Sequence, residues 1–226
     1  MTNQYKDKPY NDYGQWIRQR FPFRVQKISV DAGFSCPNRD GTISHGGCIF
    51  CDNRTFNPSY CQPSKSIAQQ MEEGKAFFRR KYPDMKYLAY FQAYSNTYAP
   101  LDVLKRRYEE ALAVEDVVGL VIGTRPDCIS PELLDYLEEL NRRTFLIVEY
   151  GIESVNDDTL RHINRGHDFE CSRRAIELTH DRGILTGGHI ILGLPGEDRE
   201  ENIRQASIVS NLKLDILKLH QLQIIK

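Results

Sequence analysis

Short apolar runs alternate with helical patterns along most of the chain. Six runs rich in aliphatic or aromatic residues predict buried strands at residues 25–30, 87–92, 117–122, 145–150, 189–194 and 216–225. Between them, apolar residues recur at helical spacing in residues 66–81, 101–113, 131–142, 169–182 and 199–211. Apolar strands that alternate with helices predict an α/β fold, in which helices cover the outer side of a parallel sheet.

The last predicted strand is unusual because the chain stops directly after it, at Lys226. Burying one aliphatic side chain is worth ~1.5–3 kcal/mol. Leaving half of this strand's apolar side chains exposed would therefore cost on the order of 5 kcal/mol, against a typical domain stability of ~5–15 kcal/mol. We expect either that a last helix and any C-terminal domain belong to a longer native chain, or that another chain covers this edge. The residues concerned are Ile216, Leu217, Leu219, Leu222, Ile224 and Ile225.

Composition adds few constraints. A length of 226 residues suits one sizeable α/β domain, and 40% hydrophobic and 27% charged residues are typical of a soluble protein. A formal net charge of −1 does not indicate nucleic-acid binding by the chain as a whole, although it is compatible with a local basic patch. The chain has no apolar run long enough to cross a membrane, and we expect a cytoplasmic protein with reduced thiols.

Three of the six cysteines lie within sixteen residues, in the spacing Cys36-x11-Cys48-x2-Cys51. A structural zinc site normally has four protein ligands, and here either His45 or Cys61 would have to supply the fourth. A [4Fe–4S] cluster also normally takes four thiolates, but three would leave one iron open to a substrate or cofactor. We favour the open cluster over zinc and over a disulfide framework.

Polar and glycine-rich segments follow four of the predicted strands, at residues 93–100, 123–127, 149–154 and 193–198. In parallel α/β folds the chemistry lies at these carboxyl ends. Glu149 and Glu153 flank a glycine, where an unpaired buried carboxylate would be costly. They are expected either to bind a cationic or hydroxyl-bearing ligand, or to form structural pairs with Arg125 or Arg165.

Other candidate side chains are less specific. His189 and His220 fall on the last two predicted strands, where they are expected to be satisfied core residues, or to touch substrate if they point inward. Cys128 and Cys171 are expected to be ordinary buried thiols.

Together, the cysteine loop and the segments FQAYSNTYAP, GTRPD, VEYGIES, NRGH and GGHIILGLPGE resemble the radical S-adenosylmethionine (SAM) enzymes. The resemblance is to the YhcC/YtqA-type proteins, relatives of the Elongator catalytic subunit, and extends from Lys27 to Ile225. It implies a partial (β/α)6 barrel with the cluster loop after the first strand. Cys36, Cys48 and Cys51 would each ligate one iron of a [4Fe–4S] cluster, and reductive cleavage of SAM at the fourth iron would give a 5′-deoxyadenosyl radical.

The resemblance also implies the contacts to SAM, though no individual catalytic residue. Glu153 departs from the pattern, because many relatives have Gln there, and a carboxylate can accept from ribose hydroxyls but cannot donate. The implied contacts are Tyr94, Ser95 and Asn96 for the methionyl part, Glu153 and Ser154 for the ribose, Arg165 for the carboxylate, and Ile191 to Gly193 for the adenine.

Within this reading, residues 1–24 form an N-terminal extension and residues 25–226 the barrel. Residues 1–9 are polar and expected to be frayed, whereas residues 10–20 predict a helix that caps the bottom of the barrel. Alternatively, this basic stretch contacts RNA phosphates, which guanidinium groups match well. It contains Arg18, Arg20, Arg24 and Lys27.

Relatives in this branch act in transfer-RNA modification, including chemistry on wobble uridine, so the implied substrate is a tRNA nucleoside. A small metabolite is the alternative within the same chemistry. A low-potential electron donor of the flavodoxin or ferredoxin type is the other expected partner. From a different class, the alternative is a non-enzymatic binding module stabilised by zinc.

Overall fold

Six parallel strands form one curved sheet in a computed structural model that describes residues 10–52, 57–79 and 84–224. The strands are β1 (Val25–Val30), β2 (Lys86–Phe91), β3 (Val117–Thr124), β4 (Phe145–Glu153), β5 (Leu185–Leu192) and β6 (Ile216–Gln221). Each strand pairs with the next one in sequence, as repeated βαβ crossovers require. The predicted partial (β/α)6 barrel is confirmed.

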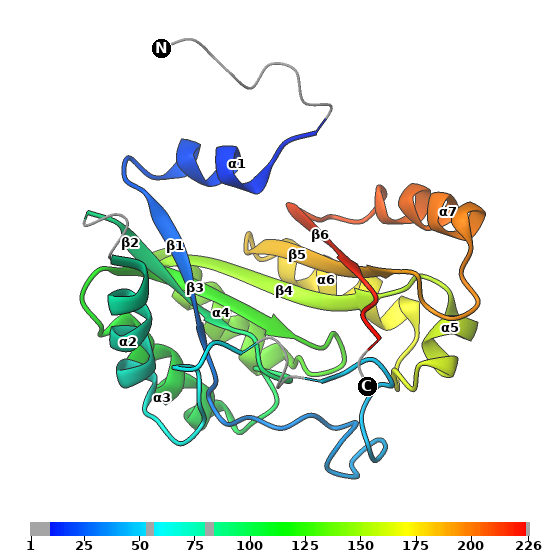
Figure 1. The fold of residues 1–226 in the computed structure, drawn as a ribbon, viewed down its shortest axis with the longest axis horizontal. Coiled ribbons are helices and arrows are strands. Elements are labelled where there is room, and N and C mark those ends of the chain that lie inside the picture. The colour runs from blue at the N-terminus through cyan, green and yellow to red at the C-terminus, as the bar shows by residue number, and fades with distance from the viewer. Residues whose placement is uncertain (1–9, 53–56, 80–83, 225–226) are drawn as a thin grey trace.

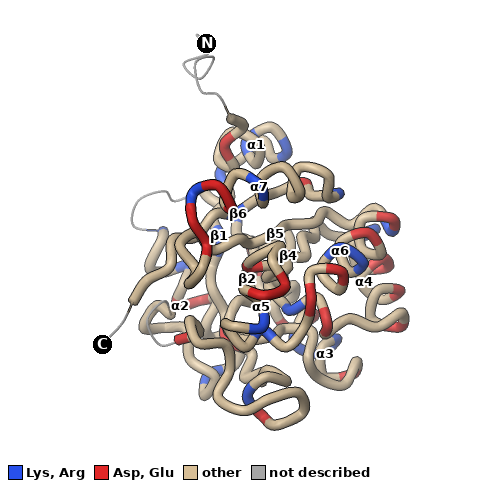
Figure 2. Tube along the Cα trace, turned by 90° about the vertical axis from the view of Figure 1, so that its right-hand side faces the viewer, with Lys and Arg blue, Asp and Glu red and all other residues tan. Residues whose placement is uncertain are grey.

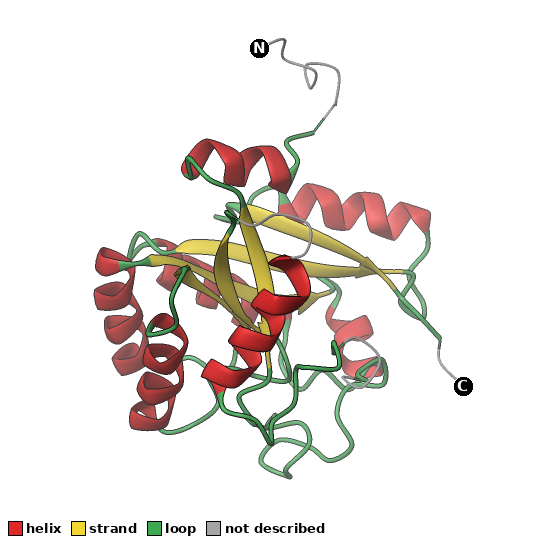
Figure 3. Ribbon diagram, turned by 60° about the vertical axis from the view of Figure 1, so that its left-hand side comes forward, coloured by secondary structure: helices red, strands yellow, loops and turns green. Residues whose placement is uncertain are grey.

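Helices cover the outer side of the sheet, as Figures 1 and 3 show. They are α2 (Ile67–Arg79), α3 (Leu101–Leu112), α4 (Pro131–Arg143), α6 (Phe169–His180) and α7 (Arg199–Val209). The main hydrophobic core lies between these helices and the strands, and includes Tyr108, Leu137 and Ile176 from three different helices. Helix ends follow the sequence signals: the Ser130 hydroxyl accepts from Leu133 N at the start of α4, and Pro131 occupies the first turn.

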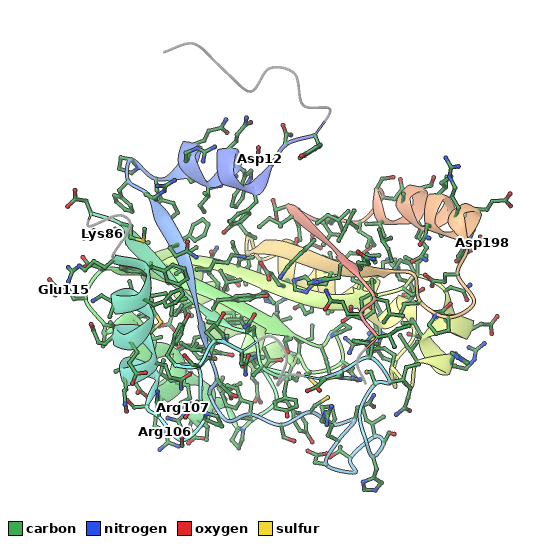
Figure 4. The ribbon with its side chains drawn as sticks, in the orientation of Figure 1. Asp12, Lys86, Arg106, Arg107, Glu115 and Asp198 are labelled. Atoms are coloured by element: carbon green, nitrogen blue, oxygen red, sulfur yellow. The ribbon has the colours of Figure 1, made fainter. Side chains whose placement is uncertain are left out.

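Helix α1 (Tyr13–Arg20) packs on the other, concave side of the sheet (Figure 1). Its Ile17 joins a second core with Leu88, Tyr90, Val121 and Ile147, the inward-facing side chains of three strands. Asp12 caps this helix and Asp198 caps α7, each by accepting from a backbone N–H three residues on (Figure 4). The helix therefore closes the barrel lumen at the amino-terminal ends of the strands with an apolar layer.

Two strand ends differ by four residues from the sequence prediction, and one helix had not been predicted. Strand β5 begins at Leu185 rather than at residue 189, and β6 ends at Gln221 rather than at residue 225. A six-residue helix, α5 (Asp157–His162), lies between β4 and α6, where no helix had been predicted. The expectation for residues 1–9 and that for Ile225 lie outside the described residues.

The outer face of β6 exposes apolar side chains, with Leu217 49% and Leu219 59% accessible. Along the backbone trace of Figure 2, positions of Lys and Arg are interspersed with those of Asp and Glu. No helix within the described ranges is both long and apolar enough to span a membrane.

Candidate functional site

The loop after β1 brings the three clustered cysteines to one cavity at the carboxyl ends of the strands. Backbone N–H groups of Arg39 and Cys51 donate to the carbonyls of Cys36 and Cys48, at 2.8 and 3.0 Å, so both ends of the motif are tight turns. Cys36, Cys48 and Cys51 all line a cavity of about 170 Å³, together with residues that end β3 and β4. The spacing of the motif had predicted that these thiols lie together, and they share this cavity.

Three arginines converge on the same cavity. Nη1 of Arg165 lies 3.7 Å from Cys48 Sγ, and Nη1 of Arg125 lies 4.0 Å from Cys36 Sγ. Nη2 of Arg39 donates to the Cys51 carbonyl at 2.7 Å. Burial raises the pKa of the Cys51 thiol, and the hydrogen bond and charge of Arg39 act in the opposite direction. The three guanidinium groups therefore bring positive charge close to the cysteine side of the cavity.

Arg125 and Arg165 are held rigidly, because both are almost fully buried. Arg125 makes a bidentate pair with Asp127, at 2.8 and 2.7 Å, and also donates to the Arg165 carbonyl at 2.8 Å. Gly151 leaves the space that Arg165 needs: a Cβ there would lie 2.3 Å from Glu153 Oε1 and 2.7 Å from Arg165 Nη2. The cationic wall of the cavity is thus fixed by packing.

The residues around the cavity fit an anionic cluster. Two buried donors, Arg39 Nε and Arg165 Nε, have no hydrogen-bond partner within the described residues. A buried unpaired donor costs ~1–3 kcal/mol, and an acceptor in the cavity would remove that cost. A [4Fe–4S] cluster on three thiolates carries negative charge and sulfurs that accept hydrogen bonds, so both the soft donor set and the arginines match it.

The two expected fourth ligands for zinc do not line this cavity. Cys61 is 3% exposed in the main core, where burial raises its pKa to about 12, and His45 is exposed. Within the described ranges, no three His, Cys, Asp or Glu side chains lie close enough together to hold a single metal ion. Burial also raises the pKa of Cys128 to about 12 and of Cys171 to about 11, consistent with ordinary thiols.

The expected contacts to the methionyl part of SAM separate into two groups. Tyr94 lines the cysteine cavity, with a positive φ of 59° and its ring 5.4 Å from the Arg39 guanidinium. Ser95 and Asn96 are fully buried, and their side chains bind Thr124 Oγ1 and the Gly123 carbonyl, at 3.0 and 2.8 Å. These two side chains therefore hold the β2 and β3 loops together rather than facing the cavity.

The expected ribose and adenine contacts also fall into two groups, those that line a cavity and those that do not. Glu153 lines the cavity at a positive φ of 68°, with Oε1 3.7 Å from Arg165 Nη2, whereas the Ser154 hydroxyl is buried and donates to Glu197. Ile191 lines a second, larger cavity, but Gly193 lines neither. No individual role had been predicted for Arg39, Gln92 or Thr124, which also line the cysteine cavity.

The second cavity, of about 490 Å³, adjoins the first in the barrel lumen and shares Phe50, Cys51, Glu153 and His189 with it, among others. Its volume falls in the ~300–1,000 Å³ range of small-molecule sites. Glu149, which lines the cysteine cavity, is 2% exposed and accepts from Lys27 Nζ at 2.6 Å and from His189 Nε2 at 3.0 Å. Pairing of Glu149 with Arg125 or Arg165 was therefore a wrong prediction, whereas Glu153 does meet Arg165. Although burial opposes it, His189 and Lys27 hold the pKa of Glu149 well below its usual range.

Comparisons with known proteins agree with this geometry. The family model described as the radical SAM superfamily matches residues 40–205. YtqA of Bacillus subtilis is 41% identical over 97% of the chain, which covers 68% of YtqA. A tRNA uridine(34) acetyltransferase of Methanocaldococcus jannaschii is 27% identical over 48% of the chain and 20% of its own length. A solved structure of Methanocaldococcus infernus Elp3 superposes with a TM-score of 0.61 at 18% identity, over 89% of this chain and 46% of that one.

Proposed function

Because the chain belongs to the radical SAM superfamily, we propose that Cys36, Cys48 and Cys51 hold a [4Fe–4S] cluster with which the protein cleaves SAM to modify a tRNA nucleoside. When bound, the cluster supplies the electron that breaks a carbon–sulfur bond of SAM and so starts radical chemistry on the substrate. The observation that carries the proposal is one cavity lined by three cysteines and three arginines, at the carboxyl ends of a parallel barrel.

The protein's own side chains bind and orient the reactants. Arg125 and Arg165 donate toward the cysteine sulfurs, which stabilises negative charge in a site of low dielectric. Arg165 and Glu153 line the cysteine cavity, and we assign to Arg165 the pairing with the SAM carboxylate and to Glu153 the acceptance of hydrogen bonds from ribose hydroxyls. Ser95, Asn96 and Ser154 contribute through the backbone that their side chains fix, and Ile191 offers an apolar surface for the adenine.

A tRNA nucleoside is the proposed substrate because one relative is a tRNA uridine(34) acetyltransferase. The near-zero net charge gives this no electrostatic support, so RNA contacts would depend on local patches such as the arginines of α1. A flavodoxin- or ferredoxin-type protein is the proposed electron donor.

Anaerobic reconstitution tests the chemistry. We expect a brown protein with about four irons per chain, which forms 5′-deoxyadenosine from SAM under dithionite. Replacing Cys36, Cys48 or Cys51 by Ser should abolish both properties, whereas Cys171→Ser on helix α6 should change neither. A colourless protein with one tightly bound zinc, or full activity in the Cys48→Ser variant, would show the proposal to be wrong.

Mass spectrometry of nucleosides tests the substrate class. The tRNA of a strain that lacks this protein should lose one modified nucleoside, and the full-length gene should restore it. An unchanged nucleoside profile would remove the tRNA substrate and leave a small metabolite as the candidate.

A further inference from the structure

Each of the three clustered cysteines has one arginine beside it. These arginines come from three separate parts of the chain: the cysteine loop itself, the segment directly after β3, and the segment between α5 and α6. All three line the cysteine cavity. The pairs are Nη1 of Arg125 at 4.0 Å from Cys36 Sγ, Nη1 of Arg165 at 3.7 Å from Cys48 Sγ, and Nη2 of Arg39 at 2.7 Å from the Cys51 carbonyl oxygen.

The chemistry of these contacts has only one direction. A guanidinium group is always charged in a protein and can only donate hydrogen bonds. No choice of tautomer or protonation state therefore enters the assignment. Arg39 Nε and Arg165 Nε are also buried and have no hydrogen-bond partner within the described residues. Both arginines thus keep a donor that no protein group in this part of the chain uses.

The three positive charges are compensated to different degrees. Arg125 forms a bidentate pair with Asp127, at 2.8 and 2.7 Å. Arg165 has a longer contact, in which Nη2 lies 3.7 Å from Glu153 Oε1. Arg39 contacts the Cys51 carbonyl and the Tyr94 ring, and no ion pair of its guanidinium is found among the described residues. Arg39 therefore brings the least compensated charge to the cavity.

Positive charge beside cysteine ligands has a predictable effect on an iron–sulfur cluster. One-electron reduction adds one negative charge, and N–H donors and positive charge close to the sulfurs stabilise the reduced form. The side chains of Arg125 and Arg165 lie almost entirely out of water, since these residues are 3% and 5% exposed, so solvent screens their charges only weakly. The arginines therefore favour the reduced form over the oxidised one.

We propose that Arg39, Arg125 and Arg165 raise the reduction potential of the cluster, and that Asp127 limits the contribution of Arg125. A higher potential makes the cluster easier to reduce by a protein donor of the flavodoxin or ferredoxin type. This inference rests on the proposed function, because it takes the three cysteines as the cluster ligands. The arginines act through charge and hydrogen bonding on the cysteine side of the cavity.

A potentiometric titration of the anaerobically reconstituted chain, followed by electron paramagnetic resonance without SAM, measures the reduction potential. Variants are compared once each is shown to hold about four irons per chain. At the wild-type midpoint potential, the ratio of reduced to oxidised cluster should fall at least tenfold in Arg39→Gln, a shift of about 59 mV for a one-electron couple. Arg39→Lys retains the charge and should recover part of the shift.

Two further variants separate a local effect from a change in net charge. Arg142→Gln removes one positive charge from the outer helix α4, where the side chain is 71% exposed, and should leave the potential unchanged. Asp127→Asn removes the negative charge that compensates Arg125 and should raise the potential. An unchanged potential in Arg39→Gln, or an equal shift in Arg142→Gln, would overturn the proposal. A potential that is unchanged or lower in Asp127→Asn would overturn the role of Asp127.

The outcome remains decisive if one variant holds no cluster. Arg39→Gln and Asp127→Asn change different segments and predict shifts of opposite sign, so the direction found in either one decides. Loss of the cluster from both would show that these side chains serve assembly rather than the potential, which would also overturn the proposal. A wild-type chain without a cluster refutes the proposed function, whereas a wild-type cluster whose potential does not respond to Arg39 refutes only this inference.

Discussion

Replacing Lys27 by Met should destabilise the protein, because it leaves the buried Glu149 carboxylate without its cationic partner. Lys27 Nζ lies 2.6 Å from Glu149 Oε1, and the two side chains are 23% and 2% exposed. Breaking a buried ion pair by removing one partner typically costs ~3–5 kcal/mol. Since Lys27 is partly exposed and His189 still donates to Glu149, we expect a loss of about 2–3 kcal/mol, a large share of a domain stability of ~5–15 kcal/mol.

Urea unfolding at pH 7 measures this loss, and two further variants isolate its cause. Glu149→Gln in the Lys27→Met background should recover part of the stability, with a coupling of roughly 1–3 kcal/mol between the two changes. Lys213→Met removes an ion pair of the same 2.6 Å length, to Asp181, but with both side chains exposed, and should have no measurable effect.

The pH dependence adds a second check. The depressed pKa of Glu149 means that its stabilisation is present above the carboxyl's unfolded pKa of about 4.3 and is lost as the pH falls through the lower folded value. The deficit of Lys27→Met should therefore be full at pH 7 and shrink in acid. Additive effects of the two substitutions, or a loss no larger than that of Lys213→Met, would refute the buried pair as a source of stability.

Two other predictions concern Gly151 and two partly buried histidines. Gly151→Ala would place a Cβ 2.3 Å from Glu153 Oε1 and 2.7 Å from Arg165 Nη2. SAM cleavage by the reconstituted enzyme should therefore fall at least tenfold, or about 1.4 kcal/mol, while the circular dichroism spectrum stays unchanged. Wild-type turnover in this variant would contradict the prediction. Burial lowers the pKa of both His167 and His220 to about 4. Because the unfolded pKa of histidine is about 6.5, the unfolded chain binds more protons than the folded chain in mild acid. The free energy of unfolding should therefore fall as the pH drops from 7 to 5, by at most ~1.4 kcal/mol per pH unit for each ring. Urea midpoints across that range check this, and His220→Gln should reduce the slope.

The spacing of apolar residues was sufficient to predict the repeated strands and helices. It failed where contacts with distant segments determine the local secondary structure. The start of β5 was missed because Gly187 and Gly188 are typical of a loop, yet the strand needs them: a Cβ on Gly187 would lie 2.8 Å from Glu149 Cγ, and one on Gly188 2.8 Å from Ile152 Cδ1. Helix α5 was missed because only Thr159 and Leu160 are buried in it, so it has no apolar periodicity to detect.

The same distinction holds in the site. The cysteines could be predicted because their ligand spacing lies within one loop, and the arginine Arg165 because it belongs to a recognisable motif. The positions of Arg39 and Arg125 beside the cysteines could not be predicted, because no local sequence pattern indicates that either guanidinium reaches the cysteine loop. Those positions depend on how the end of β3 packs against the cysteine loop.

The polar layer of the lumen is the clearest case of a feature set by register. Glu149 and Lys27 are 122 residues apart in sequence, and the two alternatives predicted for Glu149 were a ligand contact and a pair with Arg125 or Arg165. Parallel pairing places Gly151 opposite His189, and Ile191 opposite His220, so the two histidines lie on adjacent strands, with Glu149 two residues before Gly151 on the next. Curvature of the sheet then brings Lys27 on β1 close to Glu149 on β4. This contact cannot be predicted from the pairing of neighbouring strands alone. The number and tilt of the strands therefore decide which side chains meet inside the barrel. The chemistry of an inward-facing residue can be assigned only from the three-dimensional structure.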